Sequence, residues 1–330
     1  MNTTVRLPLL ILSFCCLIAQ GVFAEETPAV SPESLRNTIA KSLPYLETAG
    51  VAWIEEKDCV SCHRVSFQSW SYNAAASRGF SETEARARTW LDWSVAKSLE
   101  PNPETEKISG ETNIDGLSQL LLGHRAGTAV PMKENEQQQF VELILKTQLE
   151  DGSWVAAGQL PMQKRPKRET AEVSTMWNLL ALHTAGDSTA VDAAIERAKA
   201  WIAEAKPAVS SEWHAVRLLL ADMENNESVR EMELEQLRSL QREDGGWGWL
   251  IDAESDALAT GQALYALAAV GVDSQDPAIV RAQQYLINTQ TEDGSWPVHG
   301  TKTKKKDQVE ETATYWGTAW AVIALLETME

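Results

Sequence analysis

From residue 31 onward, apolar positions recur at helical spacing along most of the chain, with Ala, Leu, Glu and Lys as the prominent residue types. No alternation of apolar and polar residues is long enough to predict a strand. Ser31 followed by Pro32 is typical of a helix start, because Pro fits the first turn and Ser caps it. The pattern therefore predicts an all-α fold.

Three segments repeat one another and read Gln-x-x-Asp-Gly-x-Trp: Gln148–Trp154, Gln241–Trp247 and Gln290–Trp296. They begin 93 and 49 residues apart, so a degenerate copy is expected between the first two, around residues 198–220. Each segment ends an amphipathic helix and precedes a second helix of smaller residues. Gly in the turn allows a positive φ, and Gln and Trp are expected to reach the neighbouring repeat.

The same rhythm extends toward the N-terminus and gives six helix pairs. They are predicted at about residues 34–79, 81–126, 134–186, 189–222, 230–272 and 276–329. Six pairs can close into a ring, which buries the first repeat against the sixth and removes the need for polar capping repeats. We therefore predict a single α/α-toroid domain (an α6/α6 barrel) over residues 34–330.

The Gln-x-x-Asp-Gly-x-Trp segments resemble the QW repeats of squalene–hopene cyclases and related terpene cyclases, over residues 134–330. The resemblance implies the α/α toroid that these enzymes share with protein prenyltransferase β-subunits. Their acid motif, Asp-x-Asp-Asp-Thr-Ala, is not matched, since Asp252–Asp256 differs in spacing and is interpreted as an acidic helix N-terminus. The prenyltransferase zinc ligands have no counterpart either, so the resemblance is used for the fold and not for the reaction.

Cys59, Cys62 and His63 form a Cys-x-x-Cys-His motif, the spacing that attaches a c-type haem. The two thiols add to the haem vinyl groups while the imidazole reaches the iron. A zinc site would need two more ligands, and a redox disulfide is expected in a βαβ setting that the sequence does not show. We predict one covalent haem c, with His63 as the proximal iron ligand.

Residues 1–24 have the features of a secretory signal peptide. Arg6 precedes an apolar run, and small residues precede Glu25. The run is too short for a membrane span, and Phe14 before Cys15 is a poor fit to a lipoprotein site. Residues 25–33 are expected to be a disordered lead-in. We predict an exported, periplasmic protein without a membrane span after signal removal.

The charge balance is strongly acidic, with 29 Lys and Arg against 47 Asp and Glu. This argues against nucleic acids and anionic membranes as partners. Two loops are exceptions, because residues 163–168 and 302–306 are rich in Lys and Arg. They are typical of solvated charge runs, although they could also pair with haem propionates or dock an acidic partner.

The toroid topology predicts that the haem lies on the rim formed by the loops from outer to inner helices, beside the mouth of the ring. His299, in the sixth repeat, is then the first candidate for a distal iron ligand, and an open sixth position is the alternative. His214 and Met162 share that rim but lie farther around the ring. The residues expected on the opposite rim are His124, His183 and Met132.

Two classes of function follow. The first is haem electron transfer, with the toroid as a docking scaffold for a redox partner protein. The second is a haem-dependent oxidoreductase that acts on a small apolar, isoprenoid-like molecule in the toroid cavity. Inner-helix aromatic residues could line that cavity, namely Trp177, Tyr265, Tyr315 and Trp316. A cyclase-like or binding-only toroid without haem is a third, weaker reading.

Overall fold

A computed structural model describes residue 1 and residues 29–329, except 61–62, 104, 106, 157–161, 187, 207 and 306. The predicted signal peptide therefore lies outside the described residues, apart from residue 1, and so does Cys62. Within the described residues no helix is both long and apolar enough to span a membrane.

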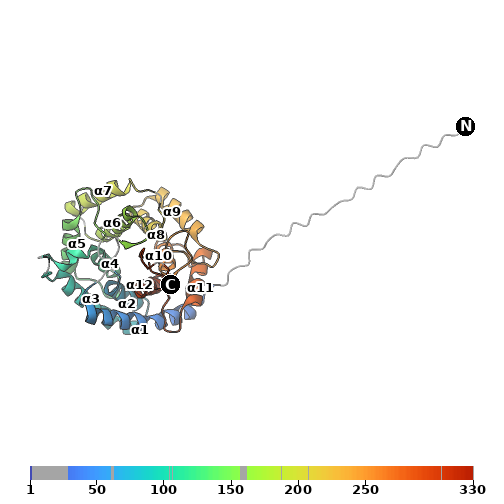
Figure 1. Cartoon of the computed structure of the whole chain (residues 1–330), viewed down its shortest axis with the longest axis horizontal. Coiled ribbons are helices and arrows are strands. Elements are labelled where there is room, and N and C mark those ends of the chain that lie inside the picture. The colour runs from blue at the N-terminus through green and yellow to red at the C-terminus, as the bar shows by residue number, and fades with distance from the viewer. Residues whose placement is uncertain are drawn as a thin grey trace.

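The part of the chain that the structure describes forms twelve α-helices in two concentric layers (Figure 1). The outer helices are α1 (Pro32–Lys57), α3 (Glu84–Leu99), α5 (Glu134–Thr147), α7 (Thr189–Ile202), α9 (Glu227–Leu240) and α11 (Pro277–Thr289). The inner helices are α2 (Val65–Ser77), α4 (Ile114–Gly123), α6 (Lys167–His183), α8 (Ser211–Met223), α10 (Ala257–Ala269) and α12 (Glu311–Glu327). Two short 3₁₀ segments, Ser81–Thr83 and Ser109–Thr112, lie in the second repeat.

The inner helices pack in chain order, and α12 returns to contact α2, so the ring closes. The outer helix α1 contacts α11 and α12, which joins the first repeat to the sixth. Across the described ranges there are isolated β-bridges between loops but no strand. The predicted all-α toroid is confirmed, and the six helix pairs fall where the repeat rhythm predicts them.

The two layers differ in burial in the way that their sequences require. Every residue from Ala257 to Leu267 in α10 is buried, because inner helices contact neighbours on all sides. In the outer helix α9, only Glu233 and Leu237 are fully buried. The core therefore fills the annulus between the layers and the interior of the ring.

The repeated Gln and Trp residues hold the ring together in two different ways. Each Trp Nε1 donates to a carbonyl near the end of the outer helix of its own repeat, as Trp247 does to Leu237 at 2.8 Å. Each Gln instead donates to the next outer helix, as Gln241 Nε2 does to Ala278 O at 2.9 Å. Gln290 Nε2 donates to Thr38 O at 2.9 Å and so closes the ring. The prediction that these residues reach the neighbouring repeat is confirmed for Gln, whereas the hydrogen bond of each Trp Nε1 stays within its own repeat.

The turn glycine is required by this contact. Gly294 has a φ of +85°, and a Cβ there would collide with the carbonyl of Lys41 on α1. Only Gly avoids both the left-handed backbone cost and the collision. The Asp-Gly turn therefore sets how closely successive outer helices approach.

The ring has two rims with different loops. The mouth rim contains the loops from outer to inner helices, and these contact one another: residue 163 bridges to residue 302, and Ser210 bridges to Leu250. The opposite rim contains the shorter connections that follow the inner helices, including His124 at the end of α4. All six inner-helix N-termini therefore point toward the mouth.

Candidate functional site

The predicted haem segment lies on the mouth rim, before α2. Cys59 is exposed and free, while Cys62 lies outside the described residues. His63 is buried, with its ring edge-on to Trp53 at 5.6 Å between centroids. Burial, and then the charges of Arg64 and Lys302, lower the pKa of His63 to about 3. Lys302 belongs to the sixth repeat, so its effect on His63 in the first repeat agrees with closure of the ring.

The candidate distal ligands lie on other loops and helices of the ring. His299 is exposed and lines a cleft between the loops of repeats five and six, and His63 is not among the residues that line it. His214 is bound to Glu233 at 2.7 Å, and Met162 is exposed. The distal iron ligand therefore stays a prediction.

Carboxylates gather at the N-termini of the inner helices, where the helix dipole favours negative charge. They lie in the first turn or at the cap of five of the six inner helices: Asp115, Glu169, Glu212, Asp256, Glu310 and Glu311. The exception is α2, which begins after Arg64. The mouth is therefore a ring of carboxylates with a few basic partners.

A rim cleft of about 530 Å³ opens between the loops of repeats five and six. Its lining includes Trp249, Asp256, Tyr285 and His299, together with the exposed carboxylates Glu254 and Asp307. This volume lies within the range of small-molecule sites. The rim cleft is thus large enough to hold a ligand of moderate size.

Asp256 is a carboxyl group of the rim cleft whose pKa is shifted by burial. Its Oδ1 accepts from Ala259 N at 2.8 Å and its Oδ2 accepts from Trp249 N at 3.0 Å, so it caps α10 as the sequence predicts. Burial nevertheless raises the pKa of Asp256 to about 6, although these backbone donors favour the carboxylate. Asp256 can therefore hold a proton at mildly acidic pH.

A second cavity, the central chamber, lies among the inner helices. It measures about 20 Å³, enough for about one water molecule. The aromatic part of its lining consists of Phe67, Trp70, Trp177, Trp316 and Trp320, and the charged part consists of Asp115, Arg165 and Glu212. All three charged residues are at most 4% exposed.

Arg165 separates the central chamber from the rim cleft. Its Nη1 donates to Glu212 Oε2 at 2.8 Å, and its guanidinium lies 5.3 Å from the centre of the Trp249 ring. Trp249 in turn lines the rim cleft. The Arg165–Trp249 pair is thus a common wall of the two cavities.

The two basic loops meet each other across the mouth. Lys164 N donates to Thr301 O at 2.9 Å, and residues 163 and 302 form a β-bridge. Arg168 pairs with Glu172 at 2.9 Å, and Lys302 lies 3.7 Å from Glu310. Lys306 lies outside the described residues. Part of this basic charge, that of Arg165, Arg168 and Lys302, thus pairs with carboxylates of the mouth.

Asp115 and Glu212 were not predicted as site residues from the sequence, and Arg165 was considered only as part of the basic run at residues 163–168. Asp115 and Glu212 stand in the first turns of helices, where acidic residues are common for electrostatic reasons alone. The available signal was their position at the start of inner helices that are otherwise largely apolar, because a carboxylate is costly to bury and is seldom placed there without a role.

The profile of the squalene-hopene cyclase C-terminal domain matches residues 217–330. No curated protein matches the chain. The match covers the last two repeats, and the closed ring extends the α/α-toroid assignment to the rest of the described chain.

The chain forms an α/α toroid, and solved structures with this shape match it over nearly their full length. A possible member of the GH105 family from Klebsiella pneumoniae has 12% identity and a TM-score of 0.60, covering 99% of this chain and 98% of that one. A glycosyl hydrolase family 88 protein from Bacteroides vulgatus has 12% identity and a TM-score of 0.60, covering 90% and 99%. A polysaccharide lyase has 10% identity and a TM-score of 0.59, covering 88% and 97%. At this level of identity the likeness shows the fold alone.

These findings correct the predicted function. Haem electron transfer is wrong as the leading interpretation, and so are its haem-oxidoreductase and cyclase-like alternatives, because the matching toroids are described as carbohydrate enzymes. The described residues also contain no group of three or more His, Cys, Asp or Glu that could hold a metal ion. The physical reason for the error is that Cys-x-x-Cys-His indicates an attachment and contains no information about the cavity of the ring.

Proposed function

We propose that the protein is a carbohydrate-processing enzyme that binds a glycan in the rim cleft and uses Asp256 as its proton donor. One observation is central: the rim cleft of about 530 Å³ contains a carboxyl group whose pKa burial raises to about 6. A large cleft that contains a titratable group with an altered pKa is the usual starting hypothesis for an active site.

The chemistry of glycan cleavage fits this group. The oxygen of the leaving sugar must be protonated as its bond breaks, and a carboxylic acid with a raised pKa does this at mildly acidic pH. The two backbone donors to Asp256 fix its orientation at the start of α10. Trp249 and Tyr285 supply ring faces against which sugar C–H groups can pack.

The comparisons support this proposal at the level of fold. A polysaccharide lyase and a glycosyl hydrolase share the toroid, and both kinds of enzyme move a proton at a glycosidic bond. The chemistry of the rim cleft is an independent argument, since a fold alone does not assign a reaction.

The test is the substitution Asp256→Asn, because Asn retains the helix cap but cannot donate the proton. Activity is measured on a panel of polysaccharides and aryl glycosides, by reducing-end release for hydrolysis and by ultraviolet absorbance of unsaturated products for elimination. We expect a loss of about 100-fold or more. The control is Asp252→Asn, the same exchange at an exposed residue of the same loop that does not line the cleft.

Two results would contradict the proposal. One is a wild-type protein that processes no member of the panel. The other is full activity in the Asp256→Asn variant, which would leave Asp256 as a helix cap only.

We further propose that the protein is an exported relative of the squalene–hopene cyclase-like toroids and holds one covalent haem c in the periplasm. The profile match at residues 217–330 and the repeated Gln and Trp segments support the relationship. Cys59 borders a cleft of about 390 Å³ that Lys57 and Lys97 also line. These lysines pair with Glu56, and with Asp58 and Glu100, and haem propionates would take the place of those carboxylates. Cys59 and Cys62 would hold the porphyrin and His63 would bind the iron, and we assign this group no electron-transfer role.

Mass spectrometry of protein exported in cells with haem maturation factors tests this cofactor. We expect the intact mass of the mature chain plus one haem, and no added haem in the Cys59→Ser/Cys62→Ser variant. A mature chain of unmodified mass would refute the proposal. A start of the mature chain other than near residue 25 would contradict the predicted cleavage site.

A further inference from the structure

The central chamber contains more negative than positive charge. Asp115 and Glu212 line it together with a single guanidinium, that of Arg165. Arg165 Nη1 also donates to Ser210 Oγ at 3.3 Å, and Ser210 Oγ donates to the buried carboxylate of Glu169. The internal guanidinium thus pairs directly with Glu212, reaches Glu169 through Ser210, and shares the chamber with Asp115.

The uncharged lining of the chamber also suits a cation. Indole rings surround it closely: the Trp177 and Trp320 centroids are 5.6 Å apart, and those of Trp70 and Trp320 are 5.5 Å apart. Aromatic faces attract ammonium and guanidinium groups, most strongly where water is excluded. Inorganic divalent cations would instead require several oxygen ligands in a regular arrangement.

The chamber in addition has hydrogen-bond donors available for a ligand. Trp316 Nε1, Trp320 Nε1 and Arg165 Nε are buried and have no hydrogen-bond partner among the residues that the structure describes. A buried donor without a partner carries a free-energy cost, which a ligand oxygen would remove. A ligand with both an ammonium group and hydroxyl oxygens would match the carboxylates and these donors together.

We propose that the central chamber binds the ammonium group of an amino sugar, and that Arg165 occupies the place of this group until the ligand displaces it. The identification of the ligand as a sugar rests on the proposed function, whereas the preference for a cation rests on the chamber alone. With Arg165 in place the chamber has room for about one water molecule, so the side chain must withdraw for the sugar to enter. Because Arg165 also stacks on Trp249, its withdrawal would join the chamber to the rim cleft.

The first experiment compares two probes that differ in charge: tetramers of glucosamine and of N-acetylglucosamine, titrated calorimetrically at pH 6 into the full-length mature protein. We expect the charged tetramer to bind at least about tenfold more tightly. Glu212→Gln removes a chamber carboxylate with little change in shape and should abolish this preference. The control is Glu311→Gln, an exposed carboxylate of the same rim that pairs with Arg64 and does not line the chamber.

The second experiment removes the internal cation. Arg165→Ala leaves Glu212 buried without its guanidinium, so the thermal midpoint should fall, and methylguanidinium at millimolar concentration should raise it again. The wild-type midpoint should not respond to methylguanidinium at that concentration, because Arg165 already fills the place. If Arg165→Ala does not fold, the titration of Glu212→Gln with the two tetramers still tests whether the chamber prefers a cation.

The outcomes separate this inference from the proposed function. Equal binding of the two tetramers, or a preference that survives Glu212→Gln, overturns the cation site even if neutral glycans are processed. A charged tetramer that binds tightly without any glycan being processed supports the cation site and contradicts the proposed enzyme.

Discussion

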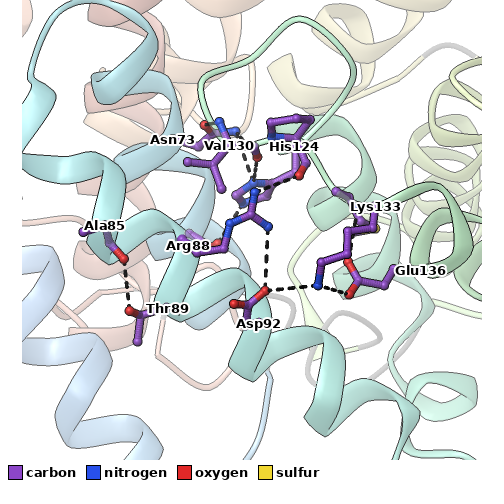
Figure 2. Close-up of polar contacts among 12 residues, drawn as sticks. Asn73, Ala85, Arg88, Thr89, Asp92, His124, Val130, Lys133 and Glu136 are labelled. Atoms are coloured by element: carbon purple, nitrogen blue, oxygen red, sulfur yellow. Dashed lines mark hydrogen bonds and ion pairs between the residues drawn. The ribbon is translucent and has the colours of Figure 1, made fainter.

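The His124 network on the opposite rim and the central chamber at the mouth differ in how completely their buried polar atoms are paired. His124, at the end of α4 on the opposite rim, is fully buried, and each nitrogen of its ring has a partner. Val130 O lies 2.7 Å from Nδ1 (Figure 2), and Ser69 Oγ lies 2.7 Å from Nε2. Asn73 completes the network by donating to Gly123 O at 2.8 Å and accepting from Val130 N at 2.8 Å.

The mouth rim is different because its buried groups are matched incompletely. The central chamber contains two carboxylates and one guanidinium, and Arg165 Nε has no partner in the described part of the chain. A satisfied network such as that of His124 stabilises one arrangement of the backbone. An unbalanced one costs stability in the free protein and is expected where a ligand completes it. The contrast thus favours a structural role for the His124 network and a ligand-binding role for the central chamber.

The largest expected effect concerns the mouth and is the pH dependence of glycan processing. If Asp256 donates the proton, only its protonated form is active, so kcat/KM should be constant below about pH 6 and fall about tenfold per pH unit above it. The measurement is a pH–rate profile of the wild type and of Asp256→Asn between pH 4.5 and 8. A wild-type profile with no decline near pH 6 would remove the argument that the mouth, rather than the opposite rim, is the catalytic region.

The second effect concerns the opposite rim and should appear in stability instead of activity. Burial lowers the pKa of His124 to about 4, whereas an unfolded His titrates near 6.5. Between these pH values the unfolded chain binds one more proton than the folded chain. The stability that His124 contributes is therefore fully present above about pH 6.5 and is lost as the pH falls toward 4. For this fully buried group the pKa shift corresponds to about 3 kcal/mol of unfolding free energy.

Urea unfolding of the wild type and His124→Gln at pH 7 and pH 4.5 measures this contribution. The variant should be less stable at pH 7 but should lose less stability on acidification. His183→Gln, at the end of α6 on the same rim, controls for the loss of an imidazole that is only partly buried. If the wild type and His124→Gln lost equal unfolding free energy between pH 7 and pH 4.5, His124 would not be the group that causes the acid destabilisation.

The same contrast explains which features could be predicted from the sequence. The repeats at Gln148, Gln241 and Gln290 set the helix ends through turns of a few consecutive residues. Such turns depend on neighbouring residue types and can therefore be predicted from the sequence. Whether Asp115 and Glu212 face one cavity depends on the closure of a ring whose repeats lie far apart in the chain. As isolated residues they are ordinary first-turn acids. Asp256 shows both cases, since its capping role was predicted and its place in the rim cleft was not.

The smallest effect tests whether the mouth rim is functional throughout. Gln290→Ala removes the bond to Thr38 that closes the ring, and Gln241→Ala removes the equivalent bond to Ala278 between adjacent repeats. Each should cost about 1 kcal/mol of unfolding free energy, because the bonds are alike in chemistry and exposure. Neither should change glycan processing or amino-sugar preference, since both Gln residues lie outside the lining of the two cavities. A loss several times larger for Gln290→Ala would identify ring closure as the weak point of the toroid, and a loss of activity in either variant would extend the functional region from the cavities to the Gln contacts.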